Sequence, residues 1–298
     1  MNMEKITTCL VCEGEILKPV LTCNDFVASN ETFNLDRCYN CSFLFTNPRP
    51  RAEEIYKYYQ SDKYISHSDK KEGLGIMYKI YDIVRNFSIK SKLKLIKKYN
   101  NSGKLMDLGC GLGYFLHGAV NDKTFTCIGV DISEDAIKYV KTAFNYDVIN
   151  ENILDNHNIK YDVITQWHVL EHVHCLNERM VQLNNLLTDN GTLFIAVPNS
   201  NSWDALHYKK FWDGYDVPRH LYHFNIKSFT HLMNKHNFDV IATKPLLFDA
   251  PYISMRSEIH KGSAFNMLKG AYYGIISNIK GLLNNEYSSL LFVVKKKK

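Results

Sequence analysis

The chain has 298 residues, of which 45% are hydrophobic and 22% are charged, and its formal net charge is +5. This length and apolar content allow one α/β domain of about 200 residues with an appendage. Part of the small positive charge comes from the terminal lysines, Lys295–Lys298, and the remainder excludes the broad basic surface that nucleic-acid binding requires.

The first residues, MNMEKITTCLVC, contain no apolar stretch of the kind found in secretory signals. Nowhere does an uncharged run reach the ~18 residues that a membrane-spanning helix needs. We therefore expect a cytoplasmic protein without a membrane span. The eight cysteines include CxxC pairs, and without an export signal such pairs favour reduced thiols and metal ligation over disulfides.

Two CxxC pairs stand close to the N-terminus, Cys9 with Cys12 and Cys38 with Cys41. Each pair places two thiolates on a tight turn, and four thiolates suit tetrahedral Zn²⁺. Four buried free thiols and an iron centre are the alternatives. We predict a structural zinc ribbon over residues 1–48 that unfolds without its metal, because so short a segment cannot build a sufficient core.

The next segment, residues 49–100, is predicted to be a linker followed by a helical cover. The stretch FTNPRPR, residues 45–51, is typical of a linker stiffened by its prolines. Helices are predicted at 52–61 and 76–99, since apolar residues recur at helical spacing in the second, with lysines between them.

From residue 101 onward, short apolar runs alternate with helical patterns. This rhythm predicts an α/β fold with a parallel, doubly wound, Rossmann-like sheet. The predicted strands are 104–108, 125–131, 146–150, 161–166, 191–197, 239–244 and 288–295, and the predicted helices are 114–121, 134–144, 176–187 and 226–236.

A glycine-rich turn follows the first of these strands, with the sequence Gly109-x-Gly111-x-Gly113. Glycine permits the backbone conformation of a strand-to-helix turn and lets a ligand approach closely. The next strand ends in Asp131, where a carboxylate can accept hydrogen bonds from the hydroxyl groups of a ribose. The pattern therefore predicts a nucleoside site at the edge of the sheet.

The residues around this turn also discriminate between ligands. A dinucleotide fingerprint would place glycine at position 114, where this chain has Tyr114. Asp107 stands two residues before the first glycine, and its negative charge suits a cationic or amino-bearing ligand better than a pyrophosphate. A nicotinamide-dependent oxidoreductase is therefore the weaker alternative.

With these features the chain resembles the class I SAM-dependent methyltransferases from about residue 80 to its end. The resemblance lies in DLGCGLG, GVDIS, YDVITQWHVLEHV and GTLFIAVPN. The stretch WDGYDVPRHLYHFNIKSF, residues 212–229, together with the cysteine-rich N-terminus, resembles a bacterial subgroup associated with surface-polysaccharide and secondary-metabolite assembly. The resemblance implies a seven-stranded sheet whose last strand is antiparallel and S-adenosyl-L-methionine (SAM) as the cofactor.

The resemblance also implies which residues contact SAM. Asp107 is expected near the amino group of the methionine moiety, the glycine backbone along methionine and ribose, and Asp131 at the ribose hydroxyls. The remaining expected contacts are Ile132 and Asn152 at the adenine and Gln166 and Trp167 near the methyl group.

Methyl transfer aligns a nucleophile behind the methyl group at about 3–3.5 Å. A hydroxyl acceptor benefits from a general base, for which histidine is suited near neutral pH. The candidate catalytic residues are His172, His220 and Glu171, which follow the fourth and fifth strands of the predicted sheet. The alternative is a buried, hydrogen-bonded histidine at either position and a structural role for Glu171. His168 is expected to be a scaffold residue of this kind.

The segment 199–224 is long for a connection between a strand and a helix, and loops of this length usually serve function. Its aromatic and charged side chains suit a sugar or an aromatic polyol. The predicted substrate-binding residues are Trp212, Tyr215, Asp216, Arg219 and His223.

An insertion, residues 246–287, separates the last two strands and is rich in apolar residues flanked by lysines. We expect a helical subdomain that caps the sheet or packs a homodimer. The alternative is an acceptor lid or an amphipathic surface that touches a lipid-linked substrate in peripheral contact with a membrane.

The sequence thus predicts a SAM-dependent methyltransferase for a small polar acceptor, such as a nucleotide- or carrier-linked sugar. O-methylation is favoured over C- or N-methylation. The non-enzymatic alternative is a SAM-fold binding or assembly subunit that docks through its zinc ribbon.

Overall fold

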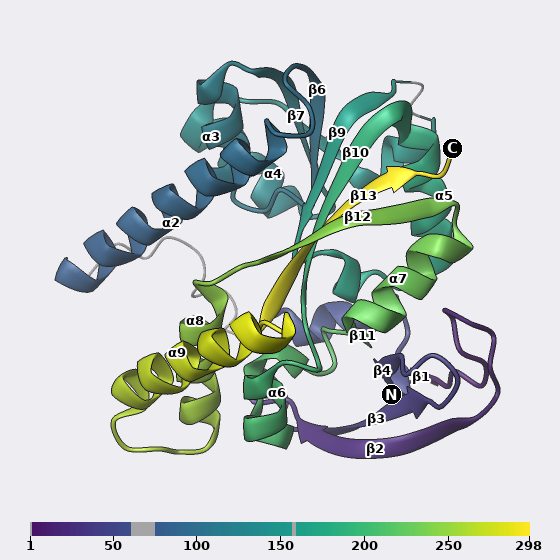
Figure 1. Cartoon of the computed structure of the whole chain (residues 1–298), viewed down its shortest axis with the longest axis vertical. Helices are drawn as coiled ribbons and strands as arrows, with labels where there is room; N and C mark the ends of the chain where they lie inside the picture. The colour runs from purple at the N-terminus through teal and green to yellow at the C-terminus, as the bar shows by residue number, and fades with distance from the viewer. Residues whose placement is uncertain (1, 61–74, 157–158) are drawn as a thin grey trace.

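A seven-stranded mixed sheet forms the centre of the computed structural model, which describes residues 2–60, 75–156 and 159–298 (Figure 1). The strand order is β12-β13-β10-β9-β6-β7-β8, and β13 runs antiparallel to both of its neighbours. This arrangement confirms the predicted Rossmann-like methyltransferase sheet. The strands are β6 (Gly103–Leu108), β7 (Phe125–Asp131), β8 (Val148–Asn150), β9 (Tyr161–Trp167), β10 (Leu187–Pro198), β12 (Phe238–Pro245) and β13 (Ser289–Lys296).

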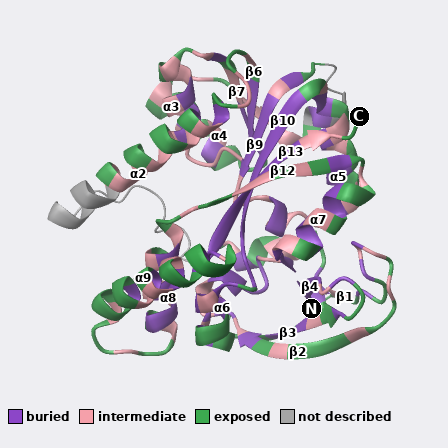
Figure 2. Ribbon diagram, in the orientation of Figure 1, coloured by how far each residue is buried: buried purple, intermediate pink, exposed green. Residues whose placement is uncertain are grey.

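Both faces of this sheet are buried, as the central strands in Figure 2 show. Consecutive residues of a strand point to opposite faces. Accordingly Leu105 and Val163 belong to one apolar cluster, whereas Met106 and Ile164 belong to another. The covering helices are α2 (Gly75–Ile96), α3 (Tyr114–Asp122), α4 (Glu134–Phe144), α5 (Leu176–Leu186) and α7 (Ile226–Lys235).

The N-terminal cysteine segment forms a four-stranded sheet, and one of its strands comes from residues 222–223, after β10 of the central sheet. Its own strands are β2 (Leu17–Asn24), β3 (Thr32–Cys38) and β4 (Leu44–Thr46), and β11 (Tyr222–His223) pairs antiparallel with β4. The segment is therefore built into the rest of the protein. We call residues 2–46 together with β11 the cysteine module.

Two predictions for the following residues were wrong. Residues 45–51 are not a free linker, because residues 45–46 belong to β4, Asn47 is buried, and β5 (Arg49–Pro50) pairs with β1 (Met3–Glu4). The predicted helix at 52–61 is only a 3-10 turn, η1 (Ile55–Tyr58), and residue 61 lies outside the described residues. Its buried Tyr58 packs edge-on against Phe33 of the cysteine module.

The insertion between β12 and β13 forms a helical hairpin of α8 (Asp249–His260) and α9 (Asn266–Asn284). The helices pack closely at Gly270 and Gly274, where an added Cβ would come within 2.4 Å of the α8 backbone. α9 exposes apolar side chains on its outer side, including Leu268, Leu282 and Leu283.

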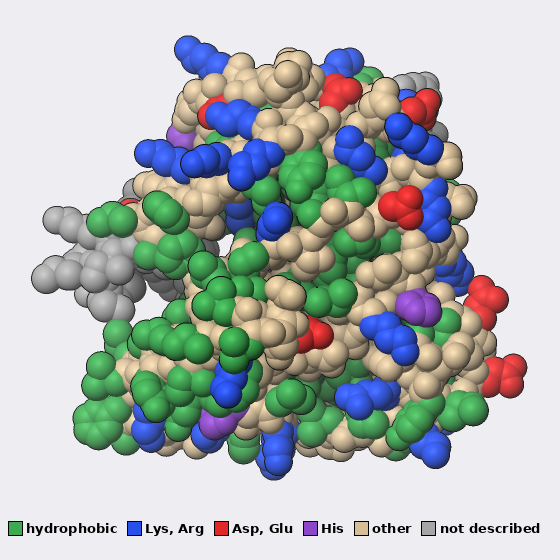
Figure 3. All heavy atoms as spheres, in the orientation of Figure 1, with side chains coloured by type: hydrophobic (Ala, Val, Ile, Leu, Met, Phe, Trp, Pro, Cys, Tyr) green, Lys and Arg blue, Asp and Glu red, His purple; other side chains and the backbone are tan. Residues whose placement is uncertain are grey.

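Figure 3 shows hydrophobic side chains gathered over this hairpin. Among the described residues, no helix is both long and apolar enough to cross a membrane. The peripheral membrane contact and the homodimer stay predictions.

Connecting segments position the rest of the chain around the sheet edge. They contain α6 (Trp203–Tyr208) and the short 3-10 turns η2 (Glu151–Asn156), η3 (Leu170–His172), η4 (Lys209–Phe211) and η5 (Asp213–Tyr215). α8 packs against α6, η4 and η5, so the insertion and the long connection after β10 form one body.

Candidate functional site

The glycine-rich turn connects β6 to α3, and all three glycines have positive φ, at 79°, 52° and 73°. An added Cβ at Gly109 or Gly113 would lie 2.5 Å from Val169 or 2.7 Å from Val140. At Gly111 it would meet nothing within 4 Å. The outer two glycines therefore serve close packing, while Gly111 leaves open space for a ligand to approach the backbone.

Asp131 is fixed at the end of β7 by two hydrogen bonds. Its Oδ2 accepts from the Gly111 amide at 2.7 Å, and its Oδ1 accepts from the Ser133 amide at 2.9 Å. Each carboxylate oxygen has a further lone pair, so the group keeps acceptor capacity for a ligand. The neighbouring Ile132 and Asn152 are exposed, so neither is committed to the core.

Asp107 and Gln166 lie fully within the protein at adjacent strand ends, and both have unmet hydrogen-bonding capacity. The Asp107 Oδ1 accepts from the Thr165 hydroxyl at 2.7 Å, but its Oδ2 has no hydrogen-bond partner among the described residues. Neither amide atom of Gln166 has one. Burial raises the pKa of Asp107 to about 7, against the hydrogen bond from Thr165 and the charge of Lys92.

Trp167 ends β9 beside these residues and is half-buried. The Lys92 ammonium of α2 lies 4.0 Å from the centroid of its indole, and Phe115 packs on it at 5.0 Å. Helix α2 thus brings a cation over the strand ends that carry Asp107 and Gln166. Among these residues, sequence reasoning missed Lys92, because its place depends on how α2 packs.

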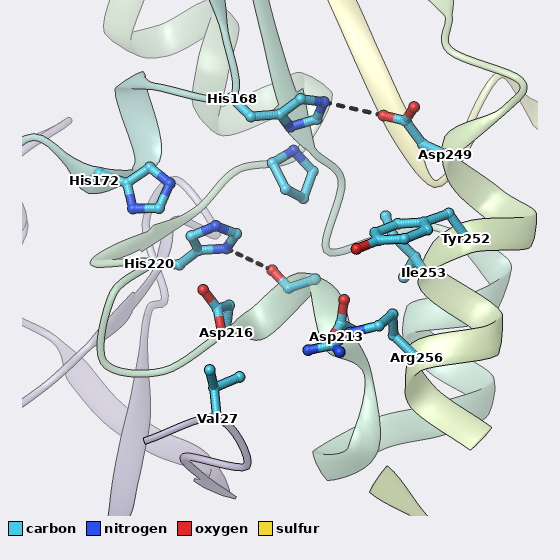
Figure 4. Close-up of a pocket in the computed structure, with 12 residues that line it drawn as sticks. Val27, His168, His172, Asp213, Asp216, His220, Asp249, Tyr252, Ile253 and Arg256 are labelled. Atoms are coloured by element: carbon cyan, nitrogen blue, oxygen red, sulfur yellow. Dashed lines mark hydrogen bonds and ion pairs between the residues drawn. The ribbon is translucent and has the colours of Figure 1, made fainter. Parts of the chain in front are cut away.

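A cavity of about 370 Å³ opens next to this edge (Figure 4). Its volume is that of a small-molecule site. Five separate parts of the chain line it: Val27 of the cysteine module, His168 and His172 after β9, Pro198 at the end of β10, the segment around η5, and α8. The lining residues of the last two parts are Asp213, Gly214, Asp216, His220, Asp249, Tyr252, Ile253 and Arg256.

His168 bridges two carboxylates in the wall of this cavity. Its Nε2 lies 3.0 Å from Asp249 Oδ2, and its Nδ1 lies 3.4 Å from Glu171 Oε1. Burial works against a charged ring, but these carboxylates outweigh it and raise the pKa of His168 to about 10. The ring is therefore an imidazolium at neutral pH and acts as a scaffold residue that cannot serve as a base.

His172 and His220 meet edge to face, with ring centroids 4.6 Å apart. The His172 Nδ1 is 2.9 Å from the Tyr59 hydroxyl and 3.1 Å from the Arg219 carbonyl oxygen. The His220 Nδ1 is 2.9 Å from the carbonyl oxygen of Gly214. Burial and the neighbouring His220 lower the pKa of His172 to about 4, so this ring is neutral at pH 7. With Glu171, all three predicted catalytic residues come together.

Asp216 is the predicted substrate-binding residue that does line the cavity. Arg219 Nε donates to its Oδ2 at 2.9 Å, and this guanidinium lowers the pKa of Asp216 to about 2 against the effect of burial. Arg219 itself is 1% exposed, and its remaining nitrogens donate to Asp25 Oδ1 and the Tyr58 carbonyl oxygen at 3.0 Å. The predicted contact of Arg219 with a substrate is replaced by a clamp between the cysteine module and the cavity wall.

Trp212, Tyr215 and His223 are buried and do not line the cavity, which corrects their prediction as substrate-binding residues. The Trp212 indole donates to Asp204 at 2.7 Å, and Tyr215 packs edge-on against the other two rings. The segment folds against the cysteine module, where burial of aromatic faces is favourable. The aromatic residues therefore support the cavity from behind.

Sequence reasoning missed Tyr59 and the α8 side chains that face the cavity. The positions of Asp249, Tyr252 and Arg256, spaced by three and four residues, place them on one face of a helix. This spacing is the only local signal for them. Tyr59 gives no such signal, because it meets His172 across 113 residues of chain.

The four predicted metal-ligating cysteines form a compact cluster in the cysteine module. The Cys9 and Cys41 sulfurs are 3.6 Å apart, those of Cys12 and Cys38 are 3.5 Å apart, and all four lie within 4.8 Å of one another. A tetrahedron with Zn–S bonds of about 2.3 Å places its sulfurs about 3.8 Å apart. The hydrogen bond from Cys41 lowers the pKa of Cys9 to about 5, and the cluster could bind zinc.

Residues 82–243 match a family model described as a methyltransferase domain. The ubiquinone biosynthesis O-methyltransferase of Pelagibacter ubique is 30% identical over 133 residues, which are 42% of this chain and 53% of that protein. The match thus spans about half the length of this curated relative.

Two solved structures are similar. A SAM-dependent methyltransferase of Archaeoglobus fulgidus has 18% identity and a TM-score of 0.49, over 71% of this chain and 94% of that one. A possible histamine N-methyltransferase of Thermotoga maritima has 17% identity and a TM-score of 0.48, over 74% and 95% of the two chains.

Proposed function

Because this chain belongs to the methyltransferase domain family, we propose that it transfers the methyl group of SAM to a small polar acceptor, most readily to a hydroxyl oxygen. One observation carries the proposal. β9 connects the two halves of the site: Gln166 and Trp167 end the strand beside Asp107, and the residue that follows, His168, already lines the cavity. A donor methyl group at the end of β9 would thus face an acceptor in the cavity.

The donor half supplies partners of the right charge for SAM. Asp131 would accept hydrogen bonds from the ribose hydroxyls, next to the open backbone of Gly111. The unpartnered Oδ2 of Asp107 would accept from the ammonium of the methionine moiety. Lys92, which lies over Trp167, would pair with the methionine carboxylate.

The acceptor half favours a hydroxyl-rich molecule. The cavity presents carboxylates from Asp213, Asp216 and Asp249 beside the imidazoles of His172 and His220. Carboxylates and imidazoles are suited to bind sugar hydroxyls and to remove a proton from one of them. A nucleotide- or carrier-linked sugar is our preferred acceptor class, since Arg256 in the wall, whose Nε pairs with Asp213 at 3.3 Å, has further guanidinium donors for a phosphate.

Calorimetry with SAM, with its demethylated product and with NAD tests the donor, followed by transfer of radiolabelled methyl groups to a panel of sugar nucleotides and phenols. We expect micromolar-range binding of both SAM forms and turnover on a hydroxyl-bearing acceptor. Binding of NAD without SAM would contradict the proposal. SAM binding without turnover on any acceptor would favour the assembly subunit, whose docking surface would be the cysteine module.

A further inference from the structure

Glu171, His172 and His220 each present a ligand atom, and these three atoms lie within 4.8 Å of one another beside the acceptor cavity. We propose that they bind one divalent transition-metal ion, of the zinc, manganese or iron(II) type, which holds the oxygen of the acceptor. This metal site is separate from the cysteine cluster, whose four ligands are all sulfur.

The two imidazoles are oriented as metal ligands. Histidines that bind a metal usually donate their other ring N–H to a backbone carbonyl or a carboxylate, which fixes the tautomer. Here His172 Nδ1 is 3.1 Å from the Arg219 carbonyl oxygen, and His220 Nδ1 is 2.9 Å from that of Gly214. These bonds leave both Nε2 atoms as lone-pair donors.

Glu171 supplies the second, independent observation. Its side chain is fully buried, and neither carboxylate oxygen has a hydrogen-bond partner among the described residues. Among the described residues, the one ion-pair contact of Glu171 is His168 Nδ1 at 3.4 Å from its Oε1, and His168 is shared with Asp249. The imidazolium therefore faces Oε1 alone, and a bound cation would satisfy the remaining lone pairs of the buried carboxylate.

The ligand set selects the metal. Two imidazoles and one carboxylate suit first-row transition ions, whereas magnesium and calcium prefer sites made of oxygen alone. Three protein ligands also leave coordination positions open for water or substrate, as in catalytic rather than structural sites. The adjoining cavity provides the room for such a substrate.

The catalytic role of this ion, activation of the acceptor hydroxyl, rests on the proposed function. With the ion bound, His172 and His220 act as ligands and not as bases, and the metal-bound hydroxyl loses its proton to solvent more readily because the cation stabilises the resulting oxyanion. The oxygen lone pair then forms the new C–O bond as the methyl C–S bond breaks, and the sulfur keeps the electron pair. The products are the methyl ether, S-adenosylhomocysteine and one proton.

The test is a titration with Mn²⁺ of the 298-residue chain prepared with one zinc ion per chain, as checked by metal analysis, and it is followed by the electron paramagnetic resonance signal of free Mn²⁺. Mn²⁺ does not displace zinc from four thiolates, so this readout reports the second site alone. We expect about one bound Mn²⁺ per chain and at least about tenfold weaker binding in Glu171→Gln and in His220→Ala. His231→Asn, a change at an exposed histidine, is the matched control and should bind as the wild type does.

Absence of stoichiometric binding to the wild type, or equal binding by folded Glu171→Gln and His220→Ala, would overturn the metal site. Two variants are used so that the misfolding of one does not decide the result. Circular dichroism identifies a variant that has not folded. Turnover is measured separately, with and without saturating Mn²⁺. Equal rates would overturn the role in activation, whereas Mn²⁺ binding without any turnover would leave the metal site standing and count against the proposed function.

Discussion

The proposed SAM-binding residues at the sheet edge, here called the donor edge, and the cavity proposed for the acceptor, here called the acceptor cavity, are adjacent. They are assembled in different ways. Apart from Lys92 of α2, the donor residues follow one another along the chain, from Asp107 to Trp167, at the ends of neighbouring strands. The cavity instead combines five separate segments, including Val27 of the cysteine module. The cysteine module is therefore a part of the acceptor region, and damage to it should impair acceptor turnover while leaving SAM binding intact.

The largest expected effect follows from removing a cysteine ligand. Structural zinc contributes about 10–16 kcal/mol of binding free energy to small zinc modules at neutral pH. Cys38→Ser should release about one zinc ion per chain, unfold the cysteine module and abolish acceptor turnover. Metal analysis measures the zinc content of the cysteine module, and calorimetry measures the affinity of the donor edge for SAM.

Cys175→Ser is the control for this experiment, because Cys175 is an exposed thiol outside the cluster. It should retain both zinc and turnover. An unchanged zinc content in Cys38→Ser would refute the zinc module. Loss of SAM affinity together with turnover would show that the two regions are not separable.

The second effect concerns the Arg219 clamp between the cysteine module and the cavity wall. Asp25 and Arg219 form a fully buried ion pair at 3.0 Å, and Asp25 also accepts from the amides of Val27, Ala28 and Ser29. Leaving a buried charge entirely without a partner costs about 3–5 kcal/mol, and the loss here should be smaller because Arg219 keeps its ion pair with Asp216. Asp25→Asn should therefore lower the free energy of unfolding, measured by denaturant titration, and reduce turnover more than SAM affinity.

The matched control breaks an exposed ion pair, Lys97 with Asp122 at 2.8 Å. Exposed pairs contribute about 0–1 kcal/mol, so Asp122→Asn should change stability little. Equal destabilisation by the two variants would show that the clamp has no special role.

These regions also differ in how far the sequence could predict them. The strand positions, the glycine turn and the place of Asp131 at a strand end were predictable, because strand periodicity and the turn residues are local properties. The partner of Arg219 lies 194 residues away, and no local pattern indicates it. The aromatic content of residues 199–224 favoured a binding surface, yet Trp212 is buried against Asp204.

The linker prediction was wrong for a related reason. Prolines and short polar stretches indicate irregular backbone, but they do not reveal whether that backbone is packed. Here Arg49 donates to Glu4 at 2.9 Å and to the Tyr222 hydroxyl at 2.8 Å, which fixes β5 against the core. Partners so distant in sequence become visible only in the folded chain.

A third effect isolates the donor edge. Asp131→Ala removes both the acceptor of the ribose hydroxyls and the partner of the Gly111 amide. Hydrogen bonds to a charged group contribute about 1.5–3 kcal/mol each, so the loss of even one should lower SAM affinity at least about tenfold. Asp135→Ala, at an exposed acid of α4, is the control and should bind SAM normally. Wild-type affinity in Asp131→Ala would refute the nucleoside site.

The smallest effect is a pH dependence of SAM binding through Asp107. Its pKa is about 7 because of burial, so the ligand-free protein carries a neutral carboxyl group below that pH and a carboxylate above it. The ammonium of SAM favours the carboxylate and lowers the pKa of Asp107 in the complex. Affinity should therefore rise as the pH rises toward 7, by up to about tenfold per unit, and level off above it.

Calorimetric titrations between pH 5.5 and 7.5 measure this dependence below the range where an α-amino group loses its proton, at about pH 7.7–8.0. Asp107→Asn should bind SAM more weakly and show a flat profile, because the amide does not titrate in this range. Acceptor-side variants such as Asp25→Asn should keep the wild-type slope, since that side chain lies in the cysteine module, away from the donor edge. If the SAM affinity of Asp107→Asn still rose with pH, the titrating group would be another residue. The proposed contact between Asp107 and the methionine moiety of SAM would then be wrong.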